Sequence, residues 1–113
     1  MNVVISEIIQ SNVAISPKSG EILYSLLDKA VSRREKVILD FTGIEMMTTA
    51  FLNVAIGQLY HKFKPEDLNT SLSLINLQKE DVSLFLKVIS RAKDYFKDQD
   101  AFNKKMTERY EDE

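Results

Sequence analysis

Residues 36–44 read KVILDFTGI and residues 45–52 read EMMTTAFL, and this stretch decides the fold. The run Val37-Ile38-Leu39 is continuously apolar, which is typical of a strand buried on both faces. Thr42-Gly43 predicts a turn. The hydroxyl pair Thr48-Thr49 predicts the start of a helix, because a threonine side chain can accept a hydrogen bond from an unpaired N–H of the first helical turn. The stretch therefore predicts a buried strand, a loop and the mouth of a helix.

Helical and strand patterns alternate on both sides of this stretch. Residues 3–15 are rich in Val and Ile and predict a strand, or a hairpin with Val13 and Ile15 on its return arm. Apolar residues at helical spacing predict amphipathic helices over residues 18–33 and 49–62. This alternation favours an α/β layer structure with right-handed crossovers between parallel strands.

The second half of the chain continues the same alternation. Residues 64–67 predict a charged loop that contains a proline, and residues 71–77 predict a third inner strand. A last amphipathic helix is expected to point its apolar residues inward, namely Val82, Phe85, Val88, Ile89, Ala92 and Phe96. We expect one domain over residues 1–97 and a charged, loosely helical tail over residues 98–113.

Composition excludes several classes of function. Hydrophobic residues make up 44% and charged residues 28% of the 113 residues, as in ordinary globular proteins. The net charge of −2 gives no footprint for nucleic acid or an anionic membrane, and the absence of cysteine excludes disulfides and thiolate metal sites. No basic leader and no run of about 20 apolar residues is present, so the chain is predicted to be cytoplasmic.

No residue pattern predicts catalysis, a cofactor or a metal. His61 is the single histidine and has no carboxylate at metal-ligand spacing, so it is expected to be a surface residue. Gly20, Gly43 and Gly57 form no phosphate-cradling motif. We therefore predict a protein that is not an enzyme.

The chain resembles the STAS domain superfamily, whose best-known members are bacterial anti-sigma factor antagonists. It is most similar to the STAS-like family of small bacterial proteins of unassigned function. The residues that carry the resemblance are 37–44 and 50–57, with 72–76 and the following helix in support. The resemblance implies a single layer of mixed, mostly parallel strands with helices packed against it. It also implies regulatory binding to a histidine-kinase-like ATPase or an anti-sigma factor.

In the antagonists, the loop before the second helix reads roughly Asp-Ser-Ser-Gly, and its second serine is phosphorylated by the partner kinase. Without gaps, these four positions fall on Thr48, Thr49, Ala50 and Phe51. The usual acceptor is therefore replaced by Ala50. The resemblance implies partner binding through these four residues and Asn53, with phosphorylation moved to Thr49 or Thr48.

Several residues of the stretch from Asp40 to Thr49 also fit purely structural roles. Thr48 and Thr49 fit a plain helix cap, and Asp40 either binds a polar ligand or accepts hydrogen bonds from loop amides near Gly43 or Thr48. Met46 and the following Met47 belong either to a protein contact or to the core.

Two other functions remain open. One is a sensor that holds a small ligand or nucleotide near Asp40, and the other is a self-assembling subunit, for example a homodimer, that pairs through the tail.

Overall fold

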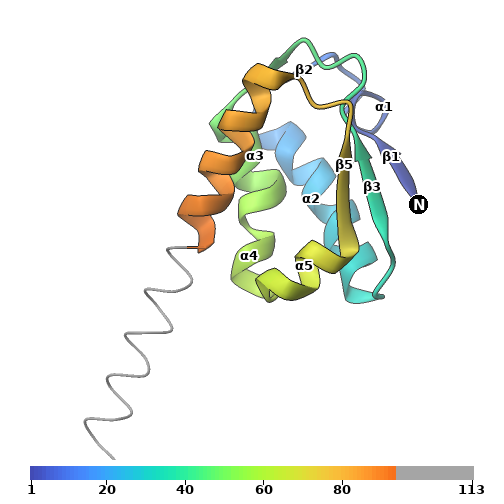
Figure 1. The fold of residues 1–113 in the computed structure, drawn as a ribbon. Helices are drawn as coiled ribbons and strands as arrows, with labels where there is room; N and C mark the ends of the chain where they lie inside the picture. The colour runs from blue at the N-terminus through green and yellow to red at the C-terminus, as the bar shows by residue number, and fades with distance from the viewer. Residues whose placement is uncertain (94–113) are drawn as a thin grey trace, which may run out of the picture.

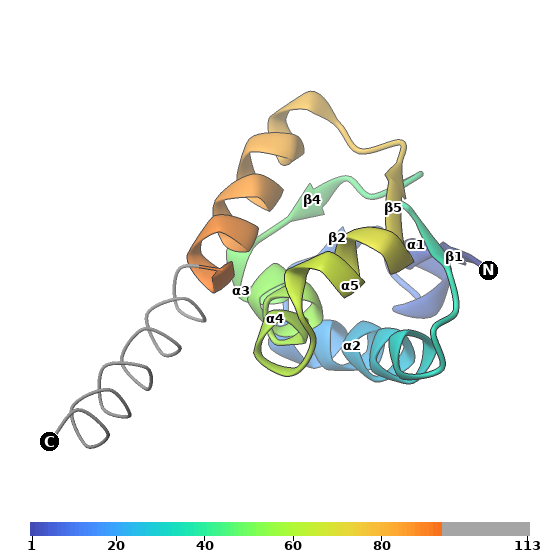
Figure 2. The same cartoon turned by 60° about the horizontal axis from the view of Figure 1, so that its bottom comes forward.

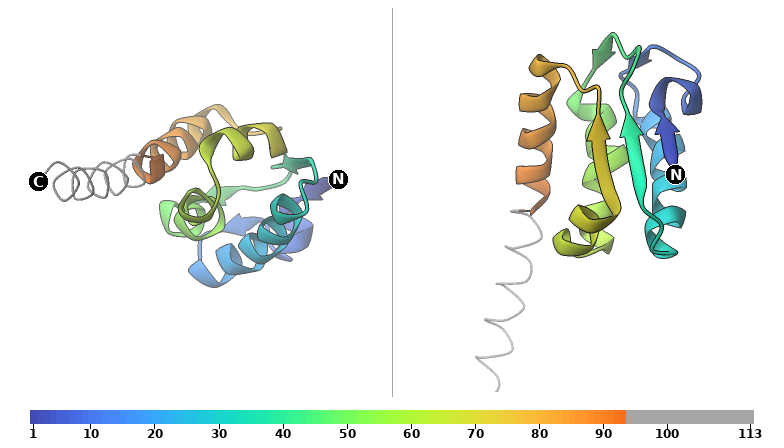
Figure 3. Two further views of the ribbon diagram at one scale, coloured as in Figure 1. Left: turned by 90° about the horizontal axis from the view of Figure 1, so that it is seen from below. Right: turned by 45° about the vertical axis from the view of Figure 1, so that its right-hand side comes forward.

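The computed structural model describes residues 1–93. Its main sheet contains β1 (Asn2–Val4), β3 (Val37–Asp40) and β5 (Leu72–Ile75). The three strands run parallel in the order β1–β3–β5, so that Leu39 of the central strand lies opposite Val3 and Leu74. Figure 1 shows the three strands side by side, and in the right view of Figure 3 the helical segments over residues 17–32 and 49–62 lie behind them. The predicted α/β class and the parallel character of the sheet are confirmed.

The segment predicted as a strand or hairpin has a different structure. After β1 the chain forms the short helix α1 (Ile5–Ile8), and β2 (Val13–Ala14) pairs in parallel with β4 (Met46–Met47). Ile5 and Ile9 are both buried, because their spacing of four residues points them to the same side of α1. A short apolar run fits a strand and a helix equally well, which is why the pattern over residues 3–15 was wrong about α1.

The first long helix follows its prediction closely. α2 (Pro17–Ser32) begins with Pro17 at its first position, and Ser16 caps it by accepting a hydrogen bond of 3.1 Å from the N–H of Ser19. Its buried side chains include Leu23 and Leu27, both fully covered. This helix therefore supplies the inner layer against which β3 packs.

The second predicted helix, over residues 49–62, is also present but is not a uniform α-helix. It consists of α3 (Thr49–Leu52), a π-helical segment η1 (Asn53–Gly57) and α4 (Leu59–Lys62). The wider turn is marked by the N–H of Gln58, which donates to the carbonyl of Asn53 at 3.1 Å. Most of the inner stripe predicted for residues 52–63 is confirmed, since the following residues are all buried: Leu52, Ala55, Ile56 and Leu59. Phe63, the last residue of that stripe, is only partly buried.

α2 and the second helix pack closely at one glycine. A Cβ atom at Gly20 would lie 2.8 Å from the carbonyl oxygen of Phe51 and 2.9 Å from Cβ of Val54. The absence of a side chain at Gly20 therefore lets the two backbones approach.

The prediction of a loop at residues 64–67 was wrong, because a further helix begins here. α5 (Pro65–Ser71) has Pro65 at its first position and Leu68 buried to 1% exposure. Glu66 and Asp67 lie in its first turn, where carboxylates interact favourably with the helix dipole. Proline and charge thus start a helix here rather than end one.

A last helix occupies residues 79–93 of the described chain. Phe85, Val88 and Ala92 are buried as predicted, and the ring of Phe85 packs edge-to-face on Phe41 with centroids 6.1 Å apart. Val82 is 37% exposed, so its predicted inward position was wrong. Phe96, the tail at residues 98–113 and the domain boundary at residue 97 lie outside the described residues. Among residues 1–93, no helix has the length and apolar character needed to cross a bilayer.

Candidate functional site

Thr48 caps the start of α3 and ties it to the end of β2. Its hydroxyl oxygen accepts a hydrogen bond of 3.3 Å from the N–H of Phe51 and donates one of 2.9 Å to the carbonyl of Ile15. The backbone N–H of Thr48 also donates to the carbonyl of Ala14 at 3.1 Å. The predicted cap is confirmed for Thr48, and the chain entering α3 is fixed in place by three bonds.

The residues after this cap point in different directions. Thr49 is partly exposed, and Ala50 and Asn53 are exposed. Phe51 is 0% exposed, because successive residues of a helix are rotated by about 100° and the third position of α3 faces the core. Phe51 therefore cannot contact a partner, which corrects its assignment to the predicted contact surface.

Exposed apolar side chains lie beside the start of α3. Val13 and Met46 are opposite each other in the β2–β4 pair and are 38% and 56% exposed, whereas their neighbours Ala14 and Met47 are buried. Ile15, whose carbonyl binds Thr48, is 42% exposed. We call Val13, Ile15 and Met46 the apolar rim. Figure 2 shows β4 leading directly into α3.

The sequence predicted only one part of the apolar rim, the methionine pair. The Met46-Met47 pair was interpreted as either contact or core, and the structure assigns one methionine to each. Val13, Ala14 and Ile15 are all apolar, so their alternation of exposed, buried and exposed positions follows from the strand geometry and not from the residue types.

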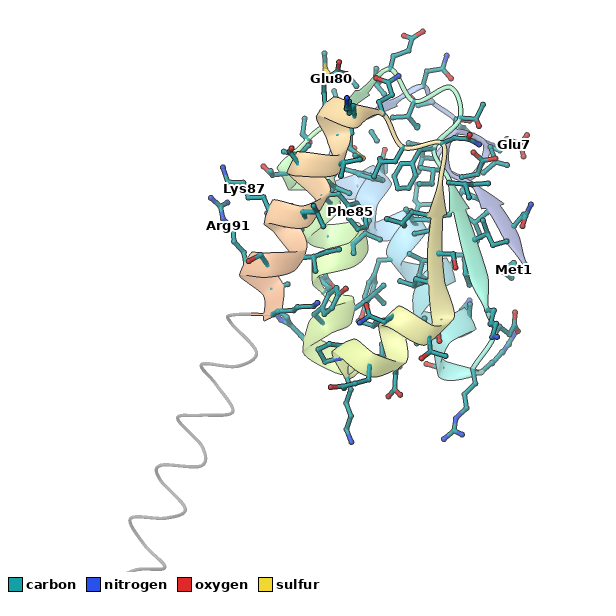
Figure 4. The ribbon with its side chains drawn as sticks, in the orientation of Figure 1. Met1, Glu7, Glu80, Phe85, Lys87 and Arg91 are labelled. Carbon is teal, nitrogen blue, oxygen red and sulfur yellow. The ribbon has the colours of Figure 1, made fainter. Side chains whose placement is uncertain are left out.

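A shallow cavity of about 240 Å³ borders the exposed side of the second helix. It is lined by Asn53, Gly57, Gln58, His61, Arg91 and Ala92. Figure 4 shows Arg91 and Lys87 projecting outward from the helix over residues 79–93. Tyr60 of the same helix is 4% exposed, and burial raises the pKa of its hydroxyl.

Asp40 lies at the carboxyl end of β3 and joins it to the end of β5. Its Oδ1 accepts hydrogen bonds from the hydroxyl of Thr42 at 2.6 Å, the N–H of Thr42 at 3.0 Å and the side-chain amide of Asn76 at 3.0 Å. The same Asn76 amide donates to the Thr42 hydroxyl at 3.0 Å. The predicted structural role is right in kind, but the donors are Thr42 and Asn76 rather than amides near Gly43 or Thr48.

Sequence reasoning missed Asn76 altogether. Its backbone has a φ of 60°, a conformation that asparagine tolerates better than most residues. An asparagine directly after an apolar strand was the signal that could have revealed this turn.

The hydrogen bonds around Asp40 predict a pH-dependent contribution to stability. The Thr42 hydroxyl, then the Asn76 amide, then the Thr42 N–H hold the pKa of Asp40 below its usual value of 3.8. The stabilisation is therefore fully present above the unfolded-state pKa and is lost as the pH falls through the folded-state pKa. We expect wild type to have a higher Tm than Asp40→Asn near neutral pH, and the difference to shrink below about pH 4.

Thermal unfolding of both proteins from pH 7 down to pH 2 tests this expectation. Thr42→Val removes the hydroxyl that lowers the pKa of Asp40 most, so it should reduce the same pH-dependent difference in Tm. A Tm difference between wild type and Asp40→Asn that stays constant to pH 2 would contradict the assignment.

Within residues 1–93, no three side chains of the types that ligate metals gather at one place. An ion pair of 2.8 Å between Lys62 Nζ and Asp28 Oδ1 joins α4 to α2, and the Asp28 carboxylate raises the pKa of Lys62. This pair connects two helices and offers no cation site.

Comparison with known protein families gives a match over more than half of the chain. The model of a family described as a STAS-like domain of unknown function matches residues 19–82, more than half of the chain. The matched span runs from α2 into the last helix and includes Asp40 and residues 48–53. No curated protein and no solved structure matches the chain.

Proposed function

Because the chain belongs to the STAS-like family of domains of unknown function, we propose that it is a non-catalytic regulatory module that binds another protein. The resemblance to anti-sigma factor antagonists favours a bacterial, cytoplasmic setting. It also favours a histidine-kinase-like ATPase or an anti-sigma factor as the partner. The proposed contact, which we call the helix-mouth surface, consists of Thr49, Ala50 and Asn53 together with the apolar rim. Thr48 stabilises the start of α3, on which part of this surface lies, by capping the helix.

The observation that carries the proposal is the exposure of the apolar rim. Isolated exposed apolar side chains are common, but grouped ones are typical of surfaces that contact other proteins. Val13 and Met46 lie side by side in the strand register, and Ile15 is held next to the cap by the hydroxyl of Thr48. The strand pair and the cap therefore hold these side chains on ordered backbone, which lowers the entropy that binding would cost.

The exposed side of the second helix beyond its start is polar and cationic. Asn53 and Arg91 line the same cavity, and Arg91 projects from the last helix. An apolar centre with a polar edge is the usual composition of a protein–protein contact. Such an edge would suit a partner that places an acidic side chain against Arg91.

Phosphorylation, if the partner is a kinase, is proposed at Thr49 in preference to Thr48. Both hydrogen-bonding roles of the Thr48 hydroxyl are already used within residues 1–93, by the carbonyl of Ile15 and the N–H of Phe51. Thr49 is partly exposed at the first position of α3, where a phosphate would interact favourably with the helix start. The added charge would lie beside the apolar rim and would weaken an apolar contact there.

The alternative of a ligand sensor at Asp40 has less support. Its Oδ1 already accepts three hydrogen bonds from Thr42 and Asn76, so a ligand would have to displace them. The alternative of self-assembly through residues 98–113 concerns a segment outside the described residues.

Two rim substitutions test the proposed contact. We expect Val13→Asp with Met46→Asp to abolish recovery of a histidine-kinase-like ATPase when the tagged full chain is pulled down from native cells with and without ATP. Loss of two central contacts of about 2 kcal/mol each, about 4 kcal/mol together, corresponds to roughly 700-fold weaker binding. Phosphopeptide mapping of residues 45–62 in the same samples tests Thr49 and Thr48 as acceptors.

Ile22→Asp is the matched control, because Ile22 is 45% exposed on α2 and does not belong to the rim. Circular dichroism should show all variants folded. Equal loss of the ATPase from the rim variant and from Ile22→Asp would contradict the helix-mouth surface.

A further inference from the structure

A larger cavity lies at the opposite end of the main sheet from the helix-mouth surface. It has a volume of about 440 Å³ and occupies the corner between the end of α2, the start of β3 and α5. Figure 1 shows these three segments meeting below the amino ends of the strands. The volume falls within the range of small-molecule sites, about 300–1,000 Å³.

The lining of this cavity combines an apolar wall with cationic and hydroxyl groups. Val31 and Phe63 form the wall, and the polar lining includes Arg34, Lys36, Asp67 and Ser71. Lys36 and Ser71 directly precede Val37 and Leu72, which are opposite each other in the β3–β5 pair. The cation of Lys36 and the hydroxyl of Ser71 are therefore brought together by the sheet register.

Neither cation forms an ion pair within residues 1–93. The ion pairs found among residues 1–93 are Arg33 with Glu35 and Lys62 with Asp28, and neither includes Arg34 or Lys36. Arg34 and Lys36 both line the cavity, so an anion bound there would interact favourably with two cations. Asp67 supplies one carboxylate to the cavity, which can accept hydrogen bonds from a hydroxylated ligand.

Arg34 also occupies a backbone position that disfavours it. Its φ is 60°, and the N–H groups of Arg34 and Glu35 donate to the carbonyls of Val31 and Ala30 at 3.0 and 2.9 Å. This is the Schellman end of a helix, in which the left-handed residue is usually glycine. Backbone geometry alone would therefore select glycine, whereas the chain has an arginine whose side chain lines the cavity.

We propose that this cavity binds a phosphate monoester of a small hydroxylated molecule. The phosphate would lie between Arg34 and Lys36, with the Ser71 hydroxyl as an additional donor. The sugar or polyol hydroxyls would donate to Asp67, and Val31 and Phe63 would contact the apolar part of the ligand. This site is separate from the helix-mouth surface, so the ligand would bind whether or not a protein partner is bound.

Isothermal titration of the full chain with ribose 5-phosphate, inorganic phosphate and ribose tests the proposal. We expect ribose 5-phosphate to bind, ribose not to bind, and inorganic phosphate to bind more weakly. Arg34→Gly should lower the affinity for ribose 5-phosphate by at least tenfold while leaving the Tm unchanged or higher, since glycine suits the left-handed position. Asp67→Asn should reduce the difference in affinity between ribose 5-phosphate and inorganic phosphate.

Arg33→Ala provides the matched control, because it removes the same charge from the neighbouring residue, which does not line this cavity. Its affinity should equal that of wild type. Absence of binding by ribose 5-phosphate, or equal losses in Arg33→Ala and Arg34→Gly, would overturn the proposal. Neither result would change recovery of the ATPase in the pull-down that tests the apolar rim. The ligand proposal and the partner proposal can therefore be contradicted independently of each other.

Discussion

Replacement of Phe51 by alanine is expected to lower the free energy of unfolding by about 3–5 kcal/mol, the usual loss for a fully buried aromatic side chain. Phe51 is 0% exposed and is the largest of the completely buried side chains among residues 1–93. Because domains of this size are stable by only about 5–15 kcal/mol, much of the stability would disappear. Denaturant unfolding followed by circular dichroism measures the change.

Two further variants separate the core role of Phe51 from a binding role. Phe51→Leu keeps most of the buried volume, so it should lose about 1 kcal/mol and still bind the partner. Ala50→Ser, at the exposed neighbouring position, should change stability by less than about 0.5 kcal/mol. Partner binding lost in Phe51→Leu, with stability near that of wild type, would contradict the assignment of Phe51 to the core.

Replacement of Gly20 by alanine is expected to destabilise the protein by about 1–3 kcal/mol, although alanine is the better helix former. The added Cβ would lie 2.8 Å from a backbone oxygen at Phe51, which cannot rotate away as a flexible side chain can. The second helix would have to shift, and the cap at Thr48 would shift with it. Tm should fall by about 4–8 °C for each kcal/mol lost.

Gly57→Ala is the matched control, since both glycines are buried and both lie in helical segments. A Cβ at Gly57 would meet no atom closer than 3.8 Å, which is ordinary contact. This variant should therefore be neutral or more stable by up to about 1 kcal/mol. If Gly20→Ala is as stable as Gly57→Ala, the close approach of the two helices is not a constraint.

Long periodic segments were the part of the fold that could be predicted from the sequence. Several local signals agree in each of three such segments. These are the apolar run at Val37–Leu39, the capped start of α2 at Ser16-Pro17 and the inner stripe of the second helix. The short elements α1 and α5 were predicted wrongly, because a few apolar or charged residues fit more than one local structure. The π-helical turn at η1 could not be predicted, because the spacing of apolar residues is the same as in an ordinary α-helix.

For the candidate site, the sequence by itself determined the chemistry that is present. It specified a hydroxyl cap at Thr48, no hydroxyl acceptor at Ala50 and an aspartate at the end of β3. These features are local, because a cap or a turn depends on residues only a few positions apart.

Only the tertiary structure decided which side chains face outward and which distant residues meet. It buried Phe51, exposed Val13 beside Met46 and brought Asn76 to Asp40 across 36 positions of sequence. It likewise placed Arg34 and Lys36 in one cavity with α5. Strand register and helix rotation set these relations, and both depend on how the whole core packs rather than on any local pattern.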